Sequence, residues 1–333
     1  MKPDHLELLR SPKTGEKLIC PDPHLVNDRI KSGVLTDAQG NQYPIIDFIP
    51  RFVKSDNYCE SFSVEWEKHP QLMFNQHSNY TLYKERFYKE TRWDNDLQGQ
   101  FVLEAGCGPG ALTSIALQTG ATLISFDASN SVEQNYKENG NNENLLIVQA
   151  DMREMPFPNL AFDKIFCFGV LQHTPDPKAS LTGLVDKLKP GGEVVSDIYT
   201  FPPAPHPYRG LMQTKYFVRR FTADMNPRKL HNLIRLYVNL LWYPSQVIRT
   251  RLRAGVQINR RLLLDDYPNR LPGMHQDLYK EFAYLDIFDF LSPRYDIPAT
   301  LDEFHEWHQN AGLEKVDVGP GYNGIEGRGV RPL

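Results

Sequence analysis

The sequence has few cysteines, and none of them form the close pairs that hold a structural metal. Cys20, Cys59, Cys107 and Cys167 are far apart and include no CxxC pair. This spacing argues against a disulfide framework or a zinc site and fits a reducing compartment. Long apolar runs are also missing, since no stretch approaches the roughly 20 apolar residues of a membrane span. The opening MKPDHLELLRSPKTG contains no apolar run typical of a secretory signal. We therefore expect a cytoplasmic protein.

Acidic residues are scarce in one part of the chain. Between residues 207 and 261 there are twelve Lys or Arg and a single acid, Asp224, whereas the rest carries 25 basic and 40 acidic residues. Such a contrast in charge within one chain indicates a surface that binds an anionic partner or ligand. Otherwise the 333 residues, 41% hydrophobic and 23% charged, describe an ordinary globular protein with one large domain or two.

Strand-like and helix-like segments alternate between about 101 and 200, a pattern typical of a parallel sheet. We expect strands at 101–105, 122–127, 145–149, 163–168 and 193–199, and helices that begin near Ala111, Ser131 and Lys178. The segment LKPGG at 188–192 is expected to end a helix before the next strand. Further on, a helix is expected from Asn226-Pro227 to Pro244, and another between a Thr300 cap and Gly312.

Three glycines alternate directly after the first of these strands, in VLEAGCGPGALTS at 102–114. Glycine costs conformational entropy, so such a cluster indicates positive φ angles or a closely approaching ligand. A strand, a glycine turn and a helix N-terminus together form a cradle for a nucleotide ligand. Read loosely, Gly106, Gly108 and Ala111 match the dinucleotide fingerprint, with Asp127 as the later ribose acid. That match alone leaves the kind of nucleotide open.

Five sequence elements in order narrow the choice. They are VLEAGCGPG, FDAS, ADMREMPFPNLAFD, GVLQHTPDP and LKPGG. Together they resemble the class I S-adenosylmethionine-dependent methyltransferases, whereas an NAD dehydrogenase would match the first two and not the last three. The resemblance implies an α/β fold with a doubly wound, mostly parallel, seven-stranded Rossmann-like sheet. It also implies S-adenosylmethionine as cofactor, S-adenosylhomocysteine as product, and no metal.

The resemblance implies cofactor-binding roles for Glu104, Gly106, Gly108, Gly110, Asp127, Asp151, Met152, Phe168 and Gly169. The glycines would let the backbone lie against the methionine part and the ribose, with Glu104 fixing the turn. Asp127 would accept hydrogen bonds from both ribose hydroxyls. Asp151 would bind the adenine amino group beside Met152, and the last two residues would face the methionine amine or the methyl group. An ordinary structural or solvated carboxylate remains the alternative for each acid.

His173, just past the fourth strand, is the candidate general base. The pKa range of histidine suits proton removal from an acceptor hydroxyl. The alternative is a histidine that braces a loop beside Pro175 and Pro177. The fourth-strand segment lacks the Asn/Asp-Pro-Pro-Tyr sequence of adenine-amino methyltransferases, which argues against that chemistry.

The N-terminal segment resembles a second family. LLRSPKTGEKL followed by SGVLTDAQGNQYPIIDFIP is similar to the zinc-ribbon activator of tRNA and release-factor methyltransferases. Where that family has two cysteine pairs, this chain has Ser11 and Thr14, then Thr36 and Gln39. None of these supplies a thiolate ligand. We expect a ribbon that has lost its metal and is held by apolar packing on the main domain, either as a docking surface or as a stabilising relic.

The sequence thus divides into five segments. These are a degenerate ribbon-like β segment (1–55), a helical extension (56–100), the S-adenosylmethionine-binding core (101–200), a basic helical insert or substrate lid (201–292), and a closing helix with the last strands (293–333). We favour a lid that binds a phosphorylated or carboxylated acceptor. A helix resting peripherally on an anionic membrane is the alternative, and core packing alone would explain the leucine stripe. No RNA-binding motif is recognisable, so we do not expect a nucleic-acid partner.

The leading functional hypothesis is methyl transfer to a small anionic acceptor, such as a sugar, a saccharide-lipid or a natural-product intermediate. The alternatives are an NAD-dependent oxidoreductase and a cofactor-binding partner subunit that does not catalyse. A fold does not fix a substrate, so the sequence leaves open the acceptor, the methylated atom (O, N or C) and the oligomeric state.

Overall fold

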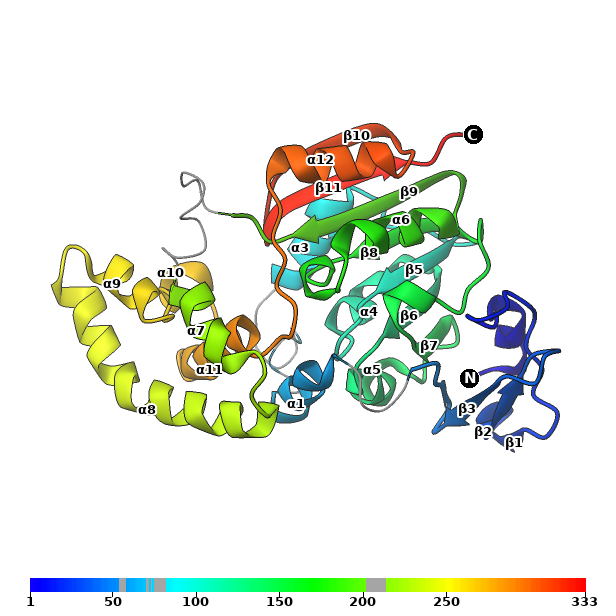
Figure 1. The fold of residues 1–333 in the computed structure, drawn as a ribbon, viewed down its shortest axis with the longest axis horizontal. Helices are drawn as coiled ribbons and strands as arrows, with labels where there is room; N and C mark the ends of the chain where they lie inside the picture. Colours follow the sequence, from blue (N-terminus) through cyan, green and yellow to red (C-terminus); the bar gives the residue numbers. More distant parts are fainter. Residues whose placement is uncertain (54–57, 70–71, 73, 75–81, 202–213) are drawn as a thin grey trace. The chain divides into compact units, whose positions relative to one another are not determined.

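The structure is a computed structural model that describes residues 1–53, 58–69, 72, 74, 82–201 and 214–333 (Figure 1). Two compact units are present. The first comprises Met1–Asn57, Lys84–Thr200 and Asp296–Leu333, and the second comprises Tyr58–Tyr83 and Phe201–Tyr295. The five-segment division stays a prediction, and its helical extension and basic insert lie partly outside the described residues.

A seven-stranded sheet forms the centre of the first unit within the described residues, in the order β10-β11-β9-β8-β5-β6-β7. Its strands are β5 (Phe101–Ala105), β6 (Thr122–Asp127), β7 (Leu145–Gln149), β8 (Phe162–Cys167), β9 (Leu188–Ile198), β10 (Glu314–Gly321) and β11 (Gly324–Val330). β5 to β9 pair in parallel, and β11 is antiparallel to both of its neighbours. The predicted doubly wound, mostly parallel sheet is therefore confirmed.

Helices cover both faces of this sheet, which explains why its central strands are almost continuously apolar. On one face α6 (Pro177–Lys187) and α12 (Leu301–Asn310) contribute Leu184 and Phe304 to the core cluster that holds Leu103 of β5. The next residue of β5, Glu104, points to the opposite face because side chains alternate along a strand. That face is covered by α3 (Leu82–Thr91), α4 (Ala111–Ala116) and α5 (Ser131–Asn139), with α4 reaching Glu104 through Thr113.

The LKPGG segment differs from its prediction. α6 already ends at Lys187, and residues 188–192 belong to β9. The ladder pairs Phe162 with Leu188 and then Lys164 with Glu193, so KPGG forms an irregular excursion in β9. By contrast, the prediction for the closing helix is confirmed, because Thr300 and Glu303 cap α12 reciprocally.

The N-terminal residues form a separate four-stranded antiparallel sheet, with the strands in sequence order. Its strands are β1 (His24–Val26), β2 (Arg29–Thr36), β3 (Gln42–Ile46) and β4 (Ile49–Pro50). The two turns that the resemblance equates with zinc-binding turns do meet, through Asp37. Its carboxylate accepts hydrogen bonds from Thr14 at 3.1 Å and from the Asn41 amide at 2.9 Å, while the Ser11 hydroxyl contacts Tyr43 at 3.0 Å. Hydrogen bonds thus link the turns where the related family has cysteines.

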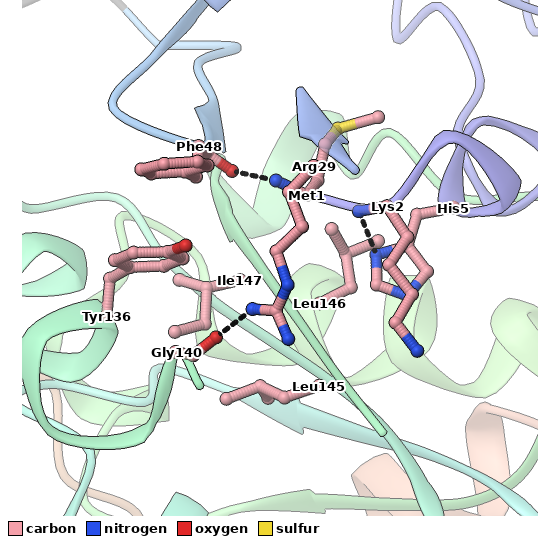
Figure 2. Close-up of a pocket in the computed structure, with 10 residues that line it drawn as sticks. All are labelled: Met1, Lys2, His5, Arg29, Phe48, Tyr136, Gly140, Leu145, Leu146 and Ile147. Atoms are coloured by element: carbon pink, nitrogen blue, oxygen red, sulfur yellow. Dashed lines mark hydrogen bonds between the residues drawn. The ribbon is translucent and has the colours of Figure 1, made fainter. Parts of the chain in front are cut away.

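The N-terminal sheet packs against the edge of the large sheet, as Figure 2 shows at one pocket of this junction. The Phe48 ring stacks on Tyr136 of α5, with centroids 5.3 Å apart. The Arg29 guanidinium donates to the carbonyl of Gly140, just past the end of α5. A cation placed there satisfies carbonyls that the helix leaves without a partner. Leu35 and Ile45 also join the core cluster of the large sheet. The predicted apolar packing is therefore accompanied by a polar cap on α5.

The described part of the second unit is helical. It contains α1 (Glu60–Lys68), α7 (Thr214–Thr222), α8 (Pro227–Arg251), α9 (Gly255–Arg261), α10 (Tyr267–Arg270) and α11 (Leu278–Leu291). Leu230, Ile234 and Val238 of α8 pack with Phe282 and Phe288 of α11 in one apolar cluster.

The prediction that the α8 helix ends at Pro244 was wrong. The helix continues through Pro244 to Arg251. A proline removes one hydrogen bond and clashes with the preceding turn. The buried Val238 and Ser245 lie on either side of it on the core-facing side of α8, so packing of that side sustains the helix through this residue.

Four short 3-10 turns complete the described elements: η1 (Pro3–Leu8), η2 (Leu117–Thr119), η3 (Met152–Glu154) and η4 (Leu171–His173). Among the described helices, none combines the length and the apolar composition needed to cross a bilayer.

Candidate functional site

Most of the predicted site residues gather at the carboxyl edge of the parallel strands. β5 lies between β8 and β6, and the chain leaves β5 and β8 toward helices on opposite faces. Such a switch point is where open α/β sheets bind their ligands. The glycine loop follows β5, Asp127 ends β6, and Gly169 follows β8. The fold therefore brings together residues that lie up to 63 positions apart in the sequence, from Gly106 to Gly169.

The glycine loop needs glycine for steric reasons. Gly106, Gly108 and Gly110 have φ angles of 76°, 51° and 97°, in the left-handed region. A Cβ on Gly106 would lie 2.2 Å from a methyl carbon of Val170, in the turn after β8. A Cβ on Gly110 would lie 2.4 Å from the side-chain oxygen of Asn135 on α5. The loop is therefore pressed between the β8 turn and α5, and no other residue type fits without displacing its neighbours.

The backbone donors of this loop are used inside the protein. The amides of Gly106 and Cys107 both donate to the carbonyl of Phe126, at 2.8 and 3.0 Å. The amide of Gly108 donates to Asp127 Oδ2 at 3.0 Å, and that of Gly110 donates to the Cys107 carbonyl at 3.1 Å. Pro109 has no N–H. Within the described loop from Gly106 to Gly110, every backbone N–H group therefore donates to an acceptor of the protein.

Asp127 is held in place from two sides. Oδ1 accepts hydrogen bonds from the amide and the hydroxyl of Ser129, at 2.8 and 2.7 Å, and Oδ2 accepts the Gly108 amide. A carboxylate has about four acceptor positions, so one stays available at Oδ2. The Ser129 hydroxyl also contacts Ser131 at 2.6 Å, so it can turn toward Ser131 and release a second position. Burial raises the pKa of Asp127, although the bonds from Ser129 and Gly108 oppose that shift.

Glu104 lies beneath the loop. Its side chain is buried on β5 and accepts hydrogen bonds from Thr113 of α4 at 2.5 Å and from Ser125 of β6 at 2.6 Å. Burial raises the pKa of Glu104 to about 7, against the opposing effect of these two hydroxyls. It therefore joins β5, β6 and the helix that follows the loop, and its contacts are with these elements.

Asp151 and Met152 lie at the end of β7. Met152 is buried in the core cluster. Both carboxylate oxygens of Asp151 accept hydrogen bonds from the Arg153 guanidinium, at 3.0 and 2.7 Å, and one of them also caps η3 through the Arg153 amide. An adenine amino group at Asp151 would share the carboxylate with Arg153, whose side chain is 51% exposed.

A buried ion cluster, which sequence reasoning missed, adjoins the turn after β8. The Gly169 amide donates to Oδ1 of Asp197 on β9 at 2.5 Å. The other oxygen of Asp197 pairs with Arg86 of α3, and Arg86 Nε donates to Glu90 at 3.0 Å. All three side chains are buried, and burial raises the pKa of both carboxyl groups.

Two aromatic rings flank Arg86. Its guanidinium lies 5.2 Å from the centroid of Phe168 and 4.8 Å from that of Tyr322, in the β10–β11 hairpin. Such distances fit cation–π contacts. An acid within the apolar VVSDI run was a usable signal for Asp197. The Arg86 and Glu90 pair has the spacing of an ordinary exposed helix pair, so the sequence could not mark it.

His173 ends η4 and is buried, with its ring edge-on to Tyr199 at a centroid distance of 5.5 Å. It thus lies in the turn after β8, in the same unit as the glycine loop. The described residues contain no group of three Cys, His, Asp or Glu side chains positioned to hold a metal ion.

The chain is similar to known methyltransferases over its parallel strands. Residues 103–196 match the family described as a methyltransferase domain. A ubiquinone biosynthesis O-methyltransferase of Pseudomonas fluorescens is 34% identical over 103 residues, which are 30% of this chain and 44% of that protein. A sterol 24-C-methyltransferase of Pneumocystis carinii is 31% identical over 100 residues, 28% of this chain and 26% of that protein. The chain therefore spans less than half the length of either relative.

Among solved structures, a phosphoethanolamine N-methyltransferase of Haemonchus contortus in complex with S-adenosyl-L-methionine has a TM-score of 0.44 and 12% identity. The match covers 76% of this chain and 52% of that one. The strand order, the glycine loop and the matched family agree over the same residues. Residues 103–196 therefore match the methyltransferase domain family, on a sheet of the class I, Rossmann-like type.

Proposed function

We propose that this chain is an enzyme that transfers a methyl group from S-adenosylmethionine to a small acceptor. The observation that carries the proposal is Asp127, fixed at the end of β6 by the Gly108 amide within the matched methyltransferase domain. When bound, the cofactor supplies a methyl group on a positively charged sulfur. The protein's own task is then to hold both reactants in line and to exclude water.

Each part of the cofactor has candidate partners at the carboxyl edge of the sheet. We assign the ribose hydroxyls to Asp127, the methionine part to the loop from Gly106 to Gly110, and the adenine to Asp151 and Met152. Phe168 and Gly169 would face the methionine amine or the methyl group, and Glu104 would hold the loop through α4. The left-handed φ angles of Gly106, Gly108 and Gly110, which favour residues without a side chain, are compatible with close contact to the cofactor.

The sequence elements favour this cofactor over NAD. An NAD dehydrogenase would match VLEAGCGPG and FDAS but not the three later elements. The matched methyltransferase domain covers the same residues. An NAD-dependent oxidoreductase therefore remains the weaker alternative.

The acceptor that we propose is small and anionic, such as a phosphorylated or carboxylated sugar, saccharide-lipid or natural-product intermediate. The excess of twelve basic residues over one acid between residues 207 and 261 supports this choice. We assign the contacts with the anionic part of the acceptor to the insert at 201–292, of which residues 202–213 lie outside the described part.

We further propose His173 as the general base for a hydroxyl acceptor. Its place in the turn after β8, where its amide donates to the Val170 carbonyl at 2.9 Å, supports this role. The variant His173→Ala should slow methyl transfer while leaving the affinity for S-adenosylhomocysteine unchanged. An unchanged rate would remove His173 from the mechanism.

Label transfer tests the whole proposal. The purified protein is incubated with methyl-labelled S-adenosylmethionine and a low-molecular-mass cell extract, and labelled products are separated by anion exchange. We expect label in an anionic small molecule, and none with Asp127→Ala. Cofactor binding without any label transfer would instead indicate a partner subunit that does not catalyse.

A further inference from the structure

One side of α8 carries large apolar side chains that the structure leaves in solvent. They are Leu233, Leu236, Leu240, Tyr243 and Val247, with exposed fractions of 52%, 57%, 66%, 75% and 60%. We call these five residues the α8 row. Their spacing alternates between three and four residues, which places them on one side of the helix. The core of the second unit uses a different side of α8, with Leu230, Ile234 and Val238. The α8 row is therefore not the stripe that packs in the core.

Cations stand at both ends of the α8 row. Lys229 precedes Leu233 by four residues and Arg251 follows Val247 by four, so both lie on the same side as the row. From residue 227 to 261 the chain has eight Lys or Arg and no acid. Three of these cations do pair with carboxylates, namely Arg228 with Glu67, Arg249 with Asp266 and Arg260 with Asp265. Among the described residues, neither Lys229 nor Arg251 has such a partner, and both are exposed.

The combination of an apolar row and uncompensated cations selects the kind of partner. A second copy of α8 would bring five further cations and no acid, so like charges would oppose the contact. A nucleic acid would use the cations but would leave the apolar row in water. An anionic lipid surface uses both, because apolar side chains enter the headgroup boundary while Lys and Arg meet the lipid phosphates.

We propose that α8 lies flat on an anionic lipid surface through the α8 row, with Lys229 and Arg251 at its ends. Tyr243, the most exposed member of the row, has the amphipathic ring that favours such an interface. The helix rests on the surface and does not cross it, in agreement with its composition. This contact is independent of the methyl transfer proposed above.

Vesicle sedimentation of the full chain tests the contact. The vesicles contain phosphatidylcholine alone or an equal mixture with phosphatidylglycerol. We expect at least about tenfold stronger partition into the mixture, and a loss of that preference at high salt. Leu240→Glu, at the centre of the α8 row, should weaken partition by about tenfold or more, because it removes an inserted side chain and adds a repelled charge.

Two controls separate this contact from general charge effects and from catalysis. Val34→Glu makes the same charge change at another apolar side chain, 43% exposed on β2, and should leave partition unchanged. Equal far-ultraviolet circular dichroism spectra of both variants and the wild type would show that the helical unit is folded in each, and S-adenosylhomocysteine affinity should be equal in all three.

Equal binding to the two kinds of vesicle, or equal binding by the wild type and Leu240→Glu, would overturn the proposal. So would sedimentation velocity that reports a dimer lost in Leu240→Glu together with no vesicle binding, since the α8 row would then be a protein–protein contact. None of these outcomes alters the test of methyl transfer.

Discussion

The amide of Gly108 donates a hydrogen bond to Oδ2 of Asp127 over 3.0 Å. This bond joins the loop after β5 to the end of β6, the two places where the sequence predicts cofactor contacts. The loop and the carboxylate fix each other, so under the proposed function the site is formed before the cofactor binds. Such preorganisation lowers the entropic cost of binding.

Removal of the Asp127 carboxylate should abolish most of the cofactor affinity. Asp127→Ala deletes two expected hydrogen bonds to the ribose, each worth about 1.5–3 kcal/mol for a charged acceptor. Titration calorimetry with S-adenosylhomocysteine should therefore show a loss of about 100-fold or more. Asp94→Ala, at an exposed acid outside the site, is the matched control and should bind normally. Full affinity in Asp127→Ala would mean that the ribose lies elsewhere.

A side chain at position 106 should lower the free energy of unfolding, because the space around Gly106 is already filled. Gly106→Ala places a Cβ against Val170 at φ 76°, and strain plus overpacking should cost about 3 kcal/mol in the free energy of unfolding. Gly99→Ala has nearly the same φ of 78° but open space around it, so only the strain of about 1 kcal/mol remains. The double variant Gly106→Ala/Val170→Gly removes all three Val170 atoms that a Cβ on Gly106 would meet, the Cβ at 2.9 Å included, and should recover part of the loss relative to Val170→Gly alone; no recovery would contradict the packing described here.

The buried carboxyl of Glu104 should make stability depend on pH. Its pKa in the folded chain is about 7, above its ordinary value of 4.5. The bound proton therefore contributes stability that is fully present below pH 4.5 and is lost as the pH rises through 7. The loss amounts to about 3 kcal/mol. Between pH 5 and pH 8, urea unfolding should show a fall in the free energy of unfolding that is about 3 kcal/mol smaller in Glu104→Gln than in the wild type and in the exposed control Glu154→Gln. Parallel behaviour of all three would contradict the assignment.

Neutral replacements of Asp197 and Glu90, the two acids beside Arg86, should change the free energy of unfolding by different amounts. Asp197→Asn leaves the Arg86 charge buried with a weakened partner and should lower the free energy of unfolding by about 3 kcal/mol. Glu90→Gln should cost less than about 1 kcal/mol, because burial and the neighbouring Asp197 already favour the neutral form of Glu90. Chemical unfolding at pH 7 separates the two. Equal losses would mean that both acids are ionised partners of Arg86.

The sequence was informative where the cause of a structure is local. Glycines with positive φ after a strand, the reciprocal cap of Thr300 and Glu303, and the apolar strands all depend on neighbouring residues, and each was found where predicted. The prediction that LKPGG ends a helix was wrong. Proline and glycine are typical of turns, but here they form an irregular part of β9.

Features set by distant contacts were not predictable. Nothing near Pro244 shows that packing would carry α8 past it. The partner of Arg86 is Asp197, 111 positions away, and the spacing of Arg86 and Glu90 equals that of any solvated helix pair. The cap that Arg29 places on the end of α5 likewise depends on how the N-terminal sheet docks.

Equilibrium dialysis of the wild-type chain against S-adenosylhomocysteine and, separately, NADH examines the cofactor directly. We expect one S-adenosylhomocysteine bound per chain and no retained NADH, because residues 103–196 match a methyltransferase domain. Retention of NADH with no S-adenosylhomocysteine bound would contradict the assignment of the site.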